Sequence, residues 1–123
     1  MITGIDHVQV AAPPGCEPAA RGFYGGLLEL AEVDKPEVLA GRGGCWFAVG
    51  GQRLHVGVAQ PFTPSAKAHP ALHVGDRDAL ETLAARLQAG GYPVEWDVNP
   101  GTARFYVHDP FGNRLELVAA GGR

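Results

Sequence analysis

Short runs of alternating apolar and polar residues mark strands along the chain, and two stretches with helical spacing interrupt them. The elements predicted in the first half are a strand at 5–11, a helix at about 18–30, a weak strand near 31–34, and strands at 45–49 and 53–59. Pro13-Pro14-Gly15 ends the first strand, and Gly50-Gly51 suits a hairpin turn between the last two. The first half therefore reads strand, helix and three strands.

The second half repeats this order after a Pro-rich segment at 61–67 that is typical of a linker. Its predicted elements are a strand at 69–74, a helix, and strands near 94–98, 103–108 and 114–119. The helix has Asp76 or Asp78 as its cap and stops at Gly90-Gly91. The turn residues at 109–113 join the last two strands. We expect one domain over 1–123, made of a module at about 1–60 and a second at about 68–120.

Successive side chains of a strand point to opposite faces, so each predicted strand sorts into an apolar and a polar column. The apolar columns, suited to pack on helices, hold Val8, Val10, Leu54, Val56, Val58, Leu72, Val74, Phe105, Val107, Leu115 and Leu117. The polar columns hold His7, Gln9, Arg53, His55, His69, His73, Arg104, Tyr106, His108, Arg114 and Glu116. A plain solvated face would favour Lys, Glu, Thr and Ser, whereas these columns are rich in His and Arg. We infer a curved sheet around a polar cavity.

Four side chains of the metal-ligand type occupy matching positions in the two halves. The partner of His7 is His69, at an offset of 69 − 7 = 62, and the partner of His55 is Glu116, at an offset of 116 − 55 = 61. The sequences around the second pair are also similar: Arg-Leu-His-Val in the first half and Arg-Leu-Glu-Leu in the second. Such spacing indicates a duplicated unit, which places all four candidates by one symmetry operation.

Composition and charge narrow the classes of function. A chain of 123 residues can bury one core, and its net charge of −3 gives no positive field for nucleic acid or an anionic membrane. The first residues have no cationic flank, and no apolar run reaches membrane-spanning length, so we expect a cytoplasmic protein. Cys16 and Cys45 are too far apart for a redox pair, and we expect reduced structural thiols.

Four stretches of the chain, specific only when taken together, carry a family resemblance. They are Ile5-Asp6-His7-Val8, Phe23-Tyr24-Gly25-Gly26-Leu27-Leu28, His69-Pro70-Ala71-Leu72-His73-Val74, and residues 105–117. The chain resembles the vicinal oxygen chelate superfamily, which includes glyoxalase I, bleomycin-resistance proteins, fosfomycin-modifying enzymes and extradiol dioxygenases. The resemblance implies an α+β fold of two βαβββ modules that form a curved, mostly antiparallel sheet around a cleft.

The resemblance also implies divalent-metal ligands on the first and last strands of the modules, which here are His7, His55, His69 and Glu116. Of these, His7, His69 and Glu116 match the commonest ligand positions of the metal-dependent relatives. This two-histidine, one-carboxylate set leaves coordination sites open for substrate, and it suits Fe, Mn, Zn or Ni. His55 stands where glyoxalase I has a glutamate that also takes part in proton transfer. His55 is therefore either a fourth ligand or a cavity acid/base.

Two functions follow from the resemblance. The first is a metal-dependent lyase, isomerase, transferase or dioxygenase in which a divalent metal chelates two oxygens of a small substrate. In this enzyme His55, Tyr106 and Arg104 are the candidate catalytic groups, the last two for an anionic substrate or an oxyanion. The second is a metal-free binding protein of the bleomycin-resistance type that sequesters a drug or metabolite. Both predict a small-molecule ligand and a homodimer, with the site inside one chain or shared between two.

Overall fold

The chain divides into two compact units, Met1–Pro64 and Ser65–Arg123, termed here the first and second units. The computed structural model describes residues 1–97, 101 and 103–119. The boundary between the units falls inside the segment predicted as a linker. Each unit contains a four-stranded sheet and a helical segment of its own.

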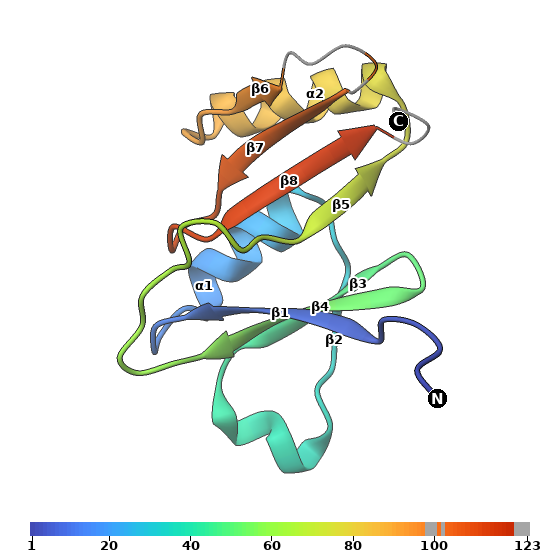
Figure 1. Ribbon diagram of the computed structural model, residues 1–123. Helices are drawn as coiled ribbons and strands as arrows, with labels where there is room; N and C mark the ends of the chain where they lie inside the picture. Colours follow the sequence, from blue (N-terminus) through green and yellow to red (C-terminus); the bar gives the residue numbers. More distant parts are fainter. Residues whose placement is uncertain (98–100, 102, 120–123) are drawn as a thin grey trace. The chain divides into compact units, whose positions relative to one another are not determined.

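The first unit has the predicted order of strand, helix and three strands, with one additional short helix. Its elements are β1 (His7–Ala12), α1 (Glu17–Ala20), η1 (Arg21–Leu27), β2 (Glu32–Val33), η2 (Glu37–Arg42), β3 (Cys45–Val49) and β4 (Gln52–Val58). The strands lie in the order β1-β4-β3-β2, as Figure 1 shows. β1 runs parallel to β4, and the other two pairs are antiparallel.

The second unit repeats this topology. Its elements are β5 (Ala71–Val74), α2 (Arg77–Ala89), β6 (Glu95–Asp97), β7 (Arg104–His108) and β8 (Arg114–Ala119). The strand order β5-β8-β7-β6 and the parallel pairing of β5 with β8 match the first unit. The predicted fold of two βαβββ modules is thus confirmed, as a mixed sheet in each unit. Of the predicted strand at 94–98, Val98 lies outside the described residues.

The pairing register supports the duplication predicted from residue spacing. Across β1 and β4, Gln9 lies opposite His55, and across β5 and β8, Ala71 lies opposite Glu116. The offsets of 62 and 61 map the first pair onto the second, since 9 + 62 = 71 and 55 + 61 = 116. His55 and Glu116 therefore occupy the same place in their sheets.

The helices differ in how closely they follow the prediction. The first begins as α1 and continues as the π-helix η1, which ends at Leu27 because Glu29 adopts a left-handed backbone (φ 58°). The second begins where predicted, since the Asp76 carboxylate accepts a hydrogen bond from the Ala79 N–H at 2.8 Å. In the described part of the chain, no helix is long and apolar enough to cross a membrane.

Aromatic side chains form the core of the first unit. The rings of Phe23 and Tyr24, both in η1, have centroids 5.0 Å apart, and Tyr24 lies 5.7 Å from Phe47 of β3. Leu54 and Val56 of β4 complete this layer, and all five residues are at most 1% exposed. Burial of this size holds a π-helix whose glycines would favour the unfolded chain.

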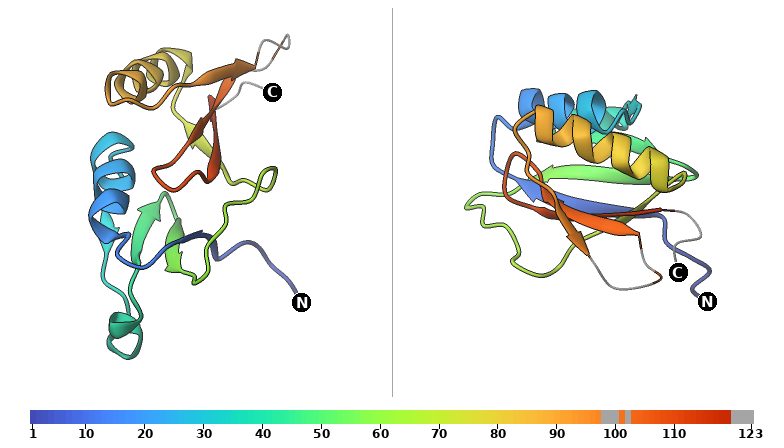
Figure 2. Two further views of the ribbon diagram at one scale, coloured as in Figure 1. Left: turned by 90° about the vertical axis from the view of Figure 1, so that its left-hand side faces the viewer. Right: turned by 90° about the horizontal axis from the view of Figure 1, so that it is seen from above.

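Leucines from α2 and β8 form the core of the second unit. Leu80 and Leu87 of α2 are fully buried, as are Phe105 of β7 and Leu115 of β8. Figure 2 shows α2 running alongside the strands of its own sheet in two further views. The helical spacing of leucines therefore predicted the packed face of α2 correctly.

The two-column sorting of the strands is confirmed in outline, with exceptions at strand ends and at the candidate site. Val8 and Val58 are each 36% exposed, because β1 is an edge strand and Val58 lies beyond the paired part of β3. On the polar side, His55 and Glu116 are only 7% and 4% exposed. His7 and Trp46 stack on His55, and His69 and Arg104 contact Glu116, so this side is not a plain solvated face.

Candidate functional site

The second unit brings His69 and Glu116 into direct contact. β8 holds Glu116 within a run of buried residues, and its N–H donates to the Pro70 carbonyl, which fixes the strand beside His69. His69 Nε2 lies 3.1 Å from Glu116 Oε1. On the other side of the ring, Nδ1 lies 2.7 Å from the Lys67 carbonyl oxygen.

These contacts determine which atom His69 presents. A carbonyl oxygen only accepts, so Nδ1 carries the proton in its contact with Lys67. Nε2 then faces the Glu116 carboxylate, and a proton or a metal ion must lie between the two atoms. Metal-ligating histidines usually donate their other N–H to a carbonyl or carboxylate in this way. Neighbouring ligand atoms bound at about 2.1 Å lie about 3 Å apart at a right angle, which matches this pair.

The second carboxylate oxygen of Glu116 is bound by Arg104. Arg104 Nη1 donates to Glu116 Oε2 at 3.0 Å, and Arg104 Nε lies 3.0 Å from Asp97 Oδ2 without hydrogen-bond geometry. Burial opposes ionisation of Glu116, but the hydrogen bonds from His69 and Arg104 outweigh it and lower the pKa of Glu116 below its usual value. Arg104 thus keeps Glu116 ionised with one oxygen directed at His69.

Tyr106 lies next to this pair. It faces Glu116 across β7 and β8, and its ring stands edge-on to His69 with centroids 5.5 Å apart. The Arg114 guanidinium lies 4.1 Å from the centre of the Tyr106 ring. A cation over the ring and a histidine at its edge fix the phenol beside the carboxylate.

The first unit brings His7 and His55 together as part of an aromatic stack. The His7 and His55 rings stack with centroids 4.1 Å apart, and Trp46 stacks on His55 at 3.8 Å. His7 Nδ1 lies 2.8 Å from Asp6 Oδ1, so the Asp6 carboxylate orients this ring as the Lys67 carbonyl orients His69. In both histidines Nε2 is the nitrogen left to bind a ligand.

His55 carries an unsatisfied atom. Its Nε2 is buried and has no hydrogen-bond partner among the residues that the structure describes. Burial, followed by the nearby His7 and Arg53, lowers the pKa of His55 below its usual value, so the ring is neutral near pH 7. A neutral imidazole with an unpaired nitrogen has the donor chemistry that a transition metal requires.

The candidate residues therefore form two pairs, one in each unit. Among the residues that the structure describes, no three His, Cys, Asp or Glu side chains are gathered into a group that could hold a metal ion. Each pair nevertheless fits a divalent ion in donor type and in the anchoring of its histidine.

Sequence reasoning missed the groups that support these pairs. Asp6 stands directly before His7, so that contact had a visible signal, whereas the carbonyl of Lys67 and the role of Asp97 had none. The sequence also gives no signal for the contact of Trp46 with His55. Its place beside His55 depends on the register of β3 and β4, where the two residues are direct partners.

The paired modules and the histidine and carboxylate positions define a glyoxalase-type protein, and the sequence comparison agrees. The chain belongs to the Glyoxalase/Bleomycin resistance protein/Dioxygenase superfamily, whose profile matches residues 4–117. No protein with a curated description matches the chain in sequence.

Solved structures of several superfamily members are similar to this chain. A Bacillus anthracis protein assigned to the glyoxalase family is 50% identical with a TM-score of 0.89, over 97% of this chain and 96% of that one. Lactoylglutathione lyase from Agrobacterium tumefaciens is 21% identical (TM-score 0.75; 98% and 96% covered). The fosfomycin resistance protein FosX from Listeria monocytogenes is 16% identical (TM-score 0.76; 97% and 94% covered). The last two show likeness of fold alone.

Proposed function

We propose that this protein is a metal-dependent enzyme that acts on a small oxygenated substrate. His7, His69 and Glu116 would hold a divalent ion, and His55 would be its fourth ligand. The observation that carries the proposal is the 3.1 Å approach of His69 Nε2 to Glu116 Oε1, with the opposite ring nitrogen anchored on a carbonyl. Such a pair needs a cation between its acceptors.

The proposed ligand set draws on both units. The described residues contain no ready group of three or more His, Cys, Asp or Glu side chains, so a metal site would require His7 and His55 to join the pair formed by His69 and Glu116. The two halves would come from one chain or from two chains of a homodimer. When bound, the ion would polarise two adjacent oxygens of the substrate and stabilise the negative charge that develops on one of them.

The chain's own residues would orient the ligands and the substrate. Asp6 and the Lys67 carbonyl engage Nδ1 of His7 and His69, so that Nε2 would be the metal-binding nitrogen of each ring, and Arg104 keeps Glu116 ionised. The Tyr106 hydroxyl would donate to a substrate oxygen beside Glu116. Arg104, already paired with two carboxylates, would act on the substrate chiefly through Glu116.

Elemental analysis tests the proposal. Protein purified without chelator or an affinity metal should contain about one transition-metal ion per site, and His7→Ala, His69→Ala and Glu116→Ala should each lose it. Incubation with manganese, nickel, zinc or anaerobic iron should restore the metal to the unaltered chain alone. Absence of metal from the unaltered chain after all four incubations would contradict the proposal.

A second function is a metal-free binding protein of the bleomycin-resistance type. The Arg104–Glu116 ion pair favours it, because this contact satisfies the buried carboxylate without any metal. It predicts no metal uptake together with tight calorimetric binding of a larger apolar or cationic ligand. Metal uptake that is lost in the three alanine variants would exclude it.

A mixed dimer distinguishes the two ways of assembling the proposed site. His7→Ala and Glu116→Ala chains would be refolded together and tested for metal content. If the site is shared between chains, the mixed dimer regains one intact site. If each site lies within one chain, the mixture stays empty.

A further inference from the structure

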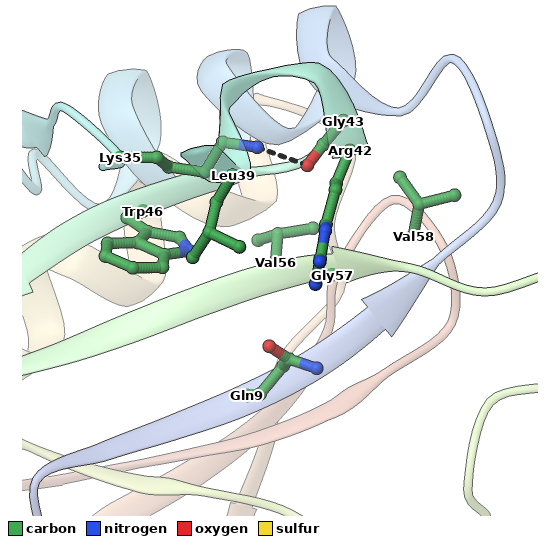
Figure 3. A pocket seen from close by; sticks show the side chains of 9 residues that line it. All are labelled: Gln9, Lys35, Leu39, Arg42, Gly43, Trp46, Val56, Gly57 and Val58. Atoms are coloured by element: carbon green, nitrogen blue, oxygen red, sulfur yellow. Dashed lines mark hydrogen bonds between the residues drawn. The ribbon is translucent and has the colours of Figure 1, made fainter. Parts of the chain in front are cut away.

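A pocket of about 280 Å³ lies wholly within the first unit, between η2 and the end of β4 (Figure 3). Its walls include Trp46 of β3 and Leu39 of η2, and β4 extends past the paired part of β3 at this point. In Figure 3 the Arg42 side chain hangs from η2 toward β4, and the Gln9 amide lies on the opposite side. None of the four proposed metal ligands lines this pocket.

Polar contacts and two glycines hold the roof of the pocket in place. Lys35 Nζ donates to the Gly43 carbonyl, and the Glu17 carboxylate accepts the Gly44 N–H at 2.6 Å. Gly44 has φ 81°, and a Cβ there would lie 2.1 Å from the Val56 carbonyl oxygen. Only glycine allows the chain to approach β4 this closely. These contacts therefore fix the backbone that shapes the pocket.

A third glycine shapes the floor. A Cβ on Gly57 would lie 2.7 Å from Gln9 Nε2 and 2.8 Å from Gln9 Cδ. The Gln9 carboxamide therefore lies flat over the Gly57 backbone and borders the pocket. This amide offers a donor and an acceptor next to the apolar wall formed by Trp46.

The charged side chains that line the pocket are all of one sign. Two of its lining residues, Lys35 and Arg42, are cationic, and no Asp or Glu lines it. Lys35 is engaged with Gly43. Arg42 is exposed, and its guanidinium has no hydrogen-bond or ion-pair partner within residues 1–97, 101 and 103–119, the part of the chain that is described. A pocket with an unpaired guanidinium suits an anionic ligand.

We propose that this pocket binds a small organic anion with a flat apolar body, such as an aromatic carboxylate. Arg42 pairs with the anionic group, Trp46 and Leu39 contact the flat body, and Gln9 donates a hydrogen bond. The volume lies at the low end for ligand pockets and suits one ring with its substituent.

Trp46 connects this pocket with the candidate metal ligands. The same indole that lines the pocket stacks on His55 at 3.8 Å. A ligand packed against Trp46 would therefore contact the indole that stacks on His55. That this ligand is the substrate of the enzyme rests on the proposed function, whereas its binding to the pocket does not.

Tryptophan fluorescence tests the binding proposal. The chain has two tryptophans, so Trp96→Phe leaves Trp46 as the only reporter. Metal-free protein would be titrated with benzoate, salicylate and phenylacetate, each beside its neutral amide. We expect saturable quenching by at least one acid, with its amide bound about tenfold more weakly. Calorimetry on the unaltered chain repeats the measurement without the reporter substitution.

Arg42→Gln should weaken binding of the acid about tenfold and leave binding of the amide unchanged. Arg53→Gln removes another exposed cation of the same unit that lies outside the pocket, and it should leave both unchanged. Glu116→Gln should also leave binding unchanged, which separates this proposal from that of the metal site. If no acid binds better than its amide, or if Arg42→Gln does not affect the acid, the proposal is wrong.

Discussion

The two units place candidate ligands at equivalent positions and surround them in opposite ways. In the first unit, His55 lies between the rings of His7 and Trp46, is held neutral, and has an unpaired nitrogen. In the second unit, Glu116 is ionised and held by His69 and Arg104. Both residues are buried in the same place of the same sheet topology.

The comparison indicates how a duplicated module can be divided into two roles. Ring stacking does not use the ring nitrogens, so the first unit holds a neutral His55 ring while its Nε2 has no hydrogen-bond partner among the described residues. A buried carboxylate requires charged partners, so the second unit has an arginine and a histidine around it. In the proposed metal site, the second pair would supply negative charge to the cation and the first pair would supply neutral donors.

The largest effect tests whether the two positions are equivalent in packing. Leu54 and Leu115 directly precede His55 and Glu116 and are 1% and 0% exposed. Leu54→Ala and Leu115→Ala should each lower the free energy of unfolding by about 2 to 5 kcal/mol, measured by urea denaturation. Val8→Ala, at an exposed edge position, is the control and should cost less than about 1 kcal/mol. If either leucine variant lost as little stability as Val8→Ala, the two positions would not be equivalent in packing.

Removal of the charge at the second position should affect metal binding most. Glu116→Gln keeps the shape of the side chain and removes its negative charge. We expect the affinity for Mn²⁺ in equilibrium dialysis to fall on the order of 100-fold or more. Glu95→Gln, an exposed carboxylate on β6, which β7 separates from β8 in the sheet, should retain the affinity of the unaltered chain. An unchanged affinity in Glu116→Gln would remove this residue from the ligand set.

The neutral His55 ring of the first unit should contribute less to metal affinity than Glu116. His55→Phe preserves the stack on Trp46 and removes both ring nitrogens. Metal affinity should fall about tenfold, because a neutral donor is lost and no charge changes. Circular dichroism should show an unchanged fold. If His55→Phe binds metal as tightly as the unaltered chain but turns over substrate slowly, His55 is a cavity acid/base and not a ligand.

The smallest effect concerns a core position that differs between the units. Cys45 lies opposite Val56, as Phe105 lies opposite Leu117, and burial raises the pKa of Cys45 to about 11. The unfolded chain ionises this thiol first, so stability falls as the pH rises above the ordinary thiol pKa of about 8.5. At about pH 9.3 the loss should be about 1 kcal/mol relative to pH 8. Cys45→Ala should lack this step in a pH series of urea denaturations.

The sequence predicted the two modules and the order of elements along each half, because a duplication repeats both residue spacing and hydrophobic periodicity. The same repeat singled out the four candidate ligands. Asp76 and the leucine spacing of α2 had local signals and were placed correctly. The π-helix η1 had no such signal, because its hydrogen-bond pattern follows from packing of Tyr24 on Phe47 rather than from propensity. η2 was missed because no apolar alternation marks it.

The supporting contacts of the candidate site could not be predicted either, because they depend on how the strands pair. Arg104 was expected to contact the substrate, yet it lies between Asp97 and Glu116, a geometry fixed by the pairing of β6, β7 and β8. A sequence gives the residue types of a face but not which of several arginines reaches a carboxylate. Only the pairing of β7 with β8 shows that Arg104, rather than Arg53 or Arg114, reaches the Glu116 carboxylate.

The most direct test of the central claim is a calorimetric Mn²⁺ titration of the unaltered chain beside His7→Ala and His69→Ala. These variants remove one candidate ligand from each unit. The account predicts one ion per site in the unaltered chain and a loss of at least about 100-fold in affinity in both variants. A His7→Ala chain that binds Mn²⁺ as tightly as the unaltered chain would contradict the claim that the two pairs complete one metal centre.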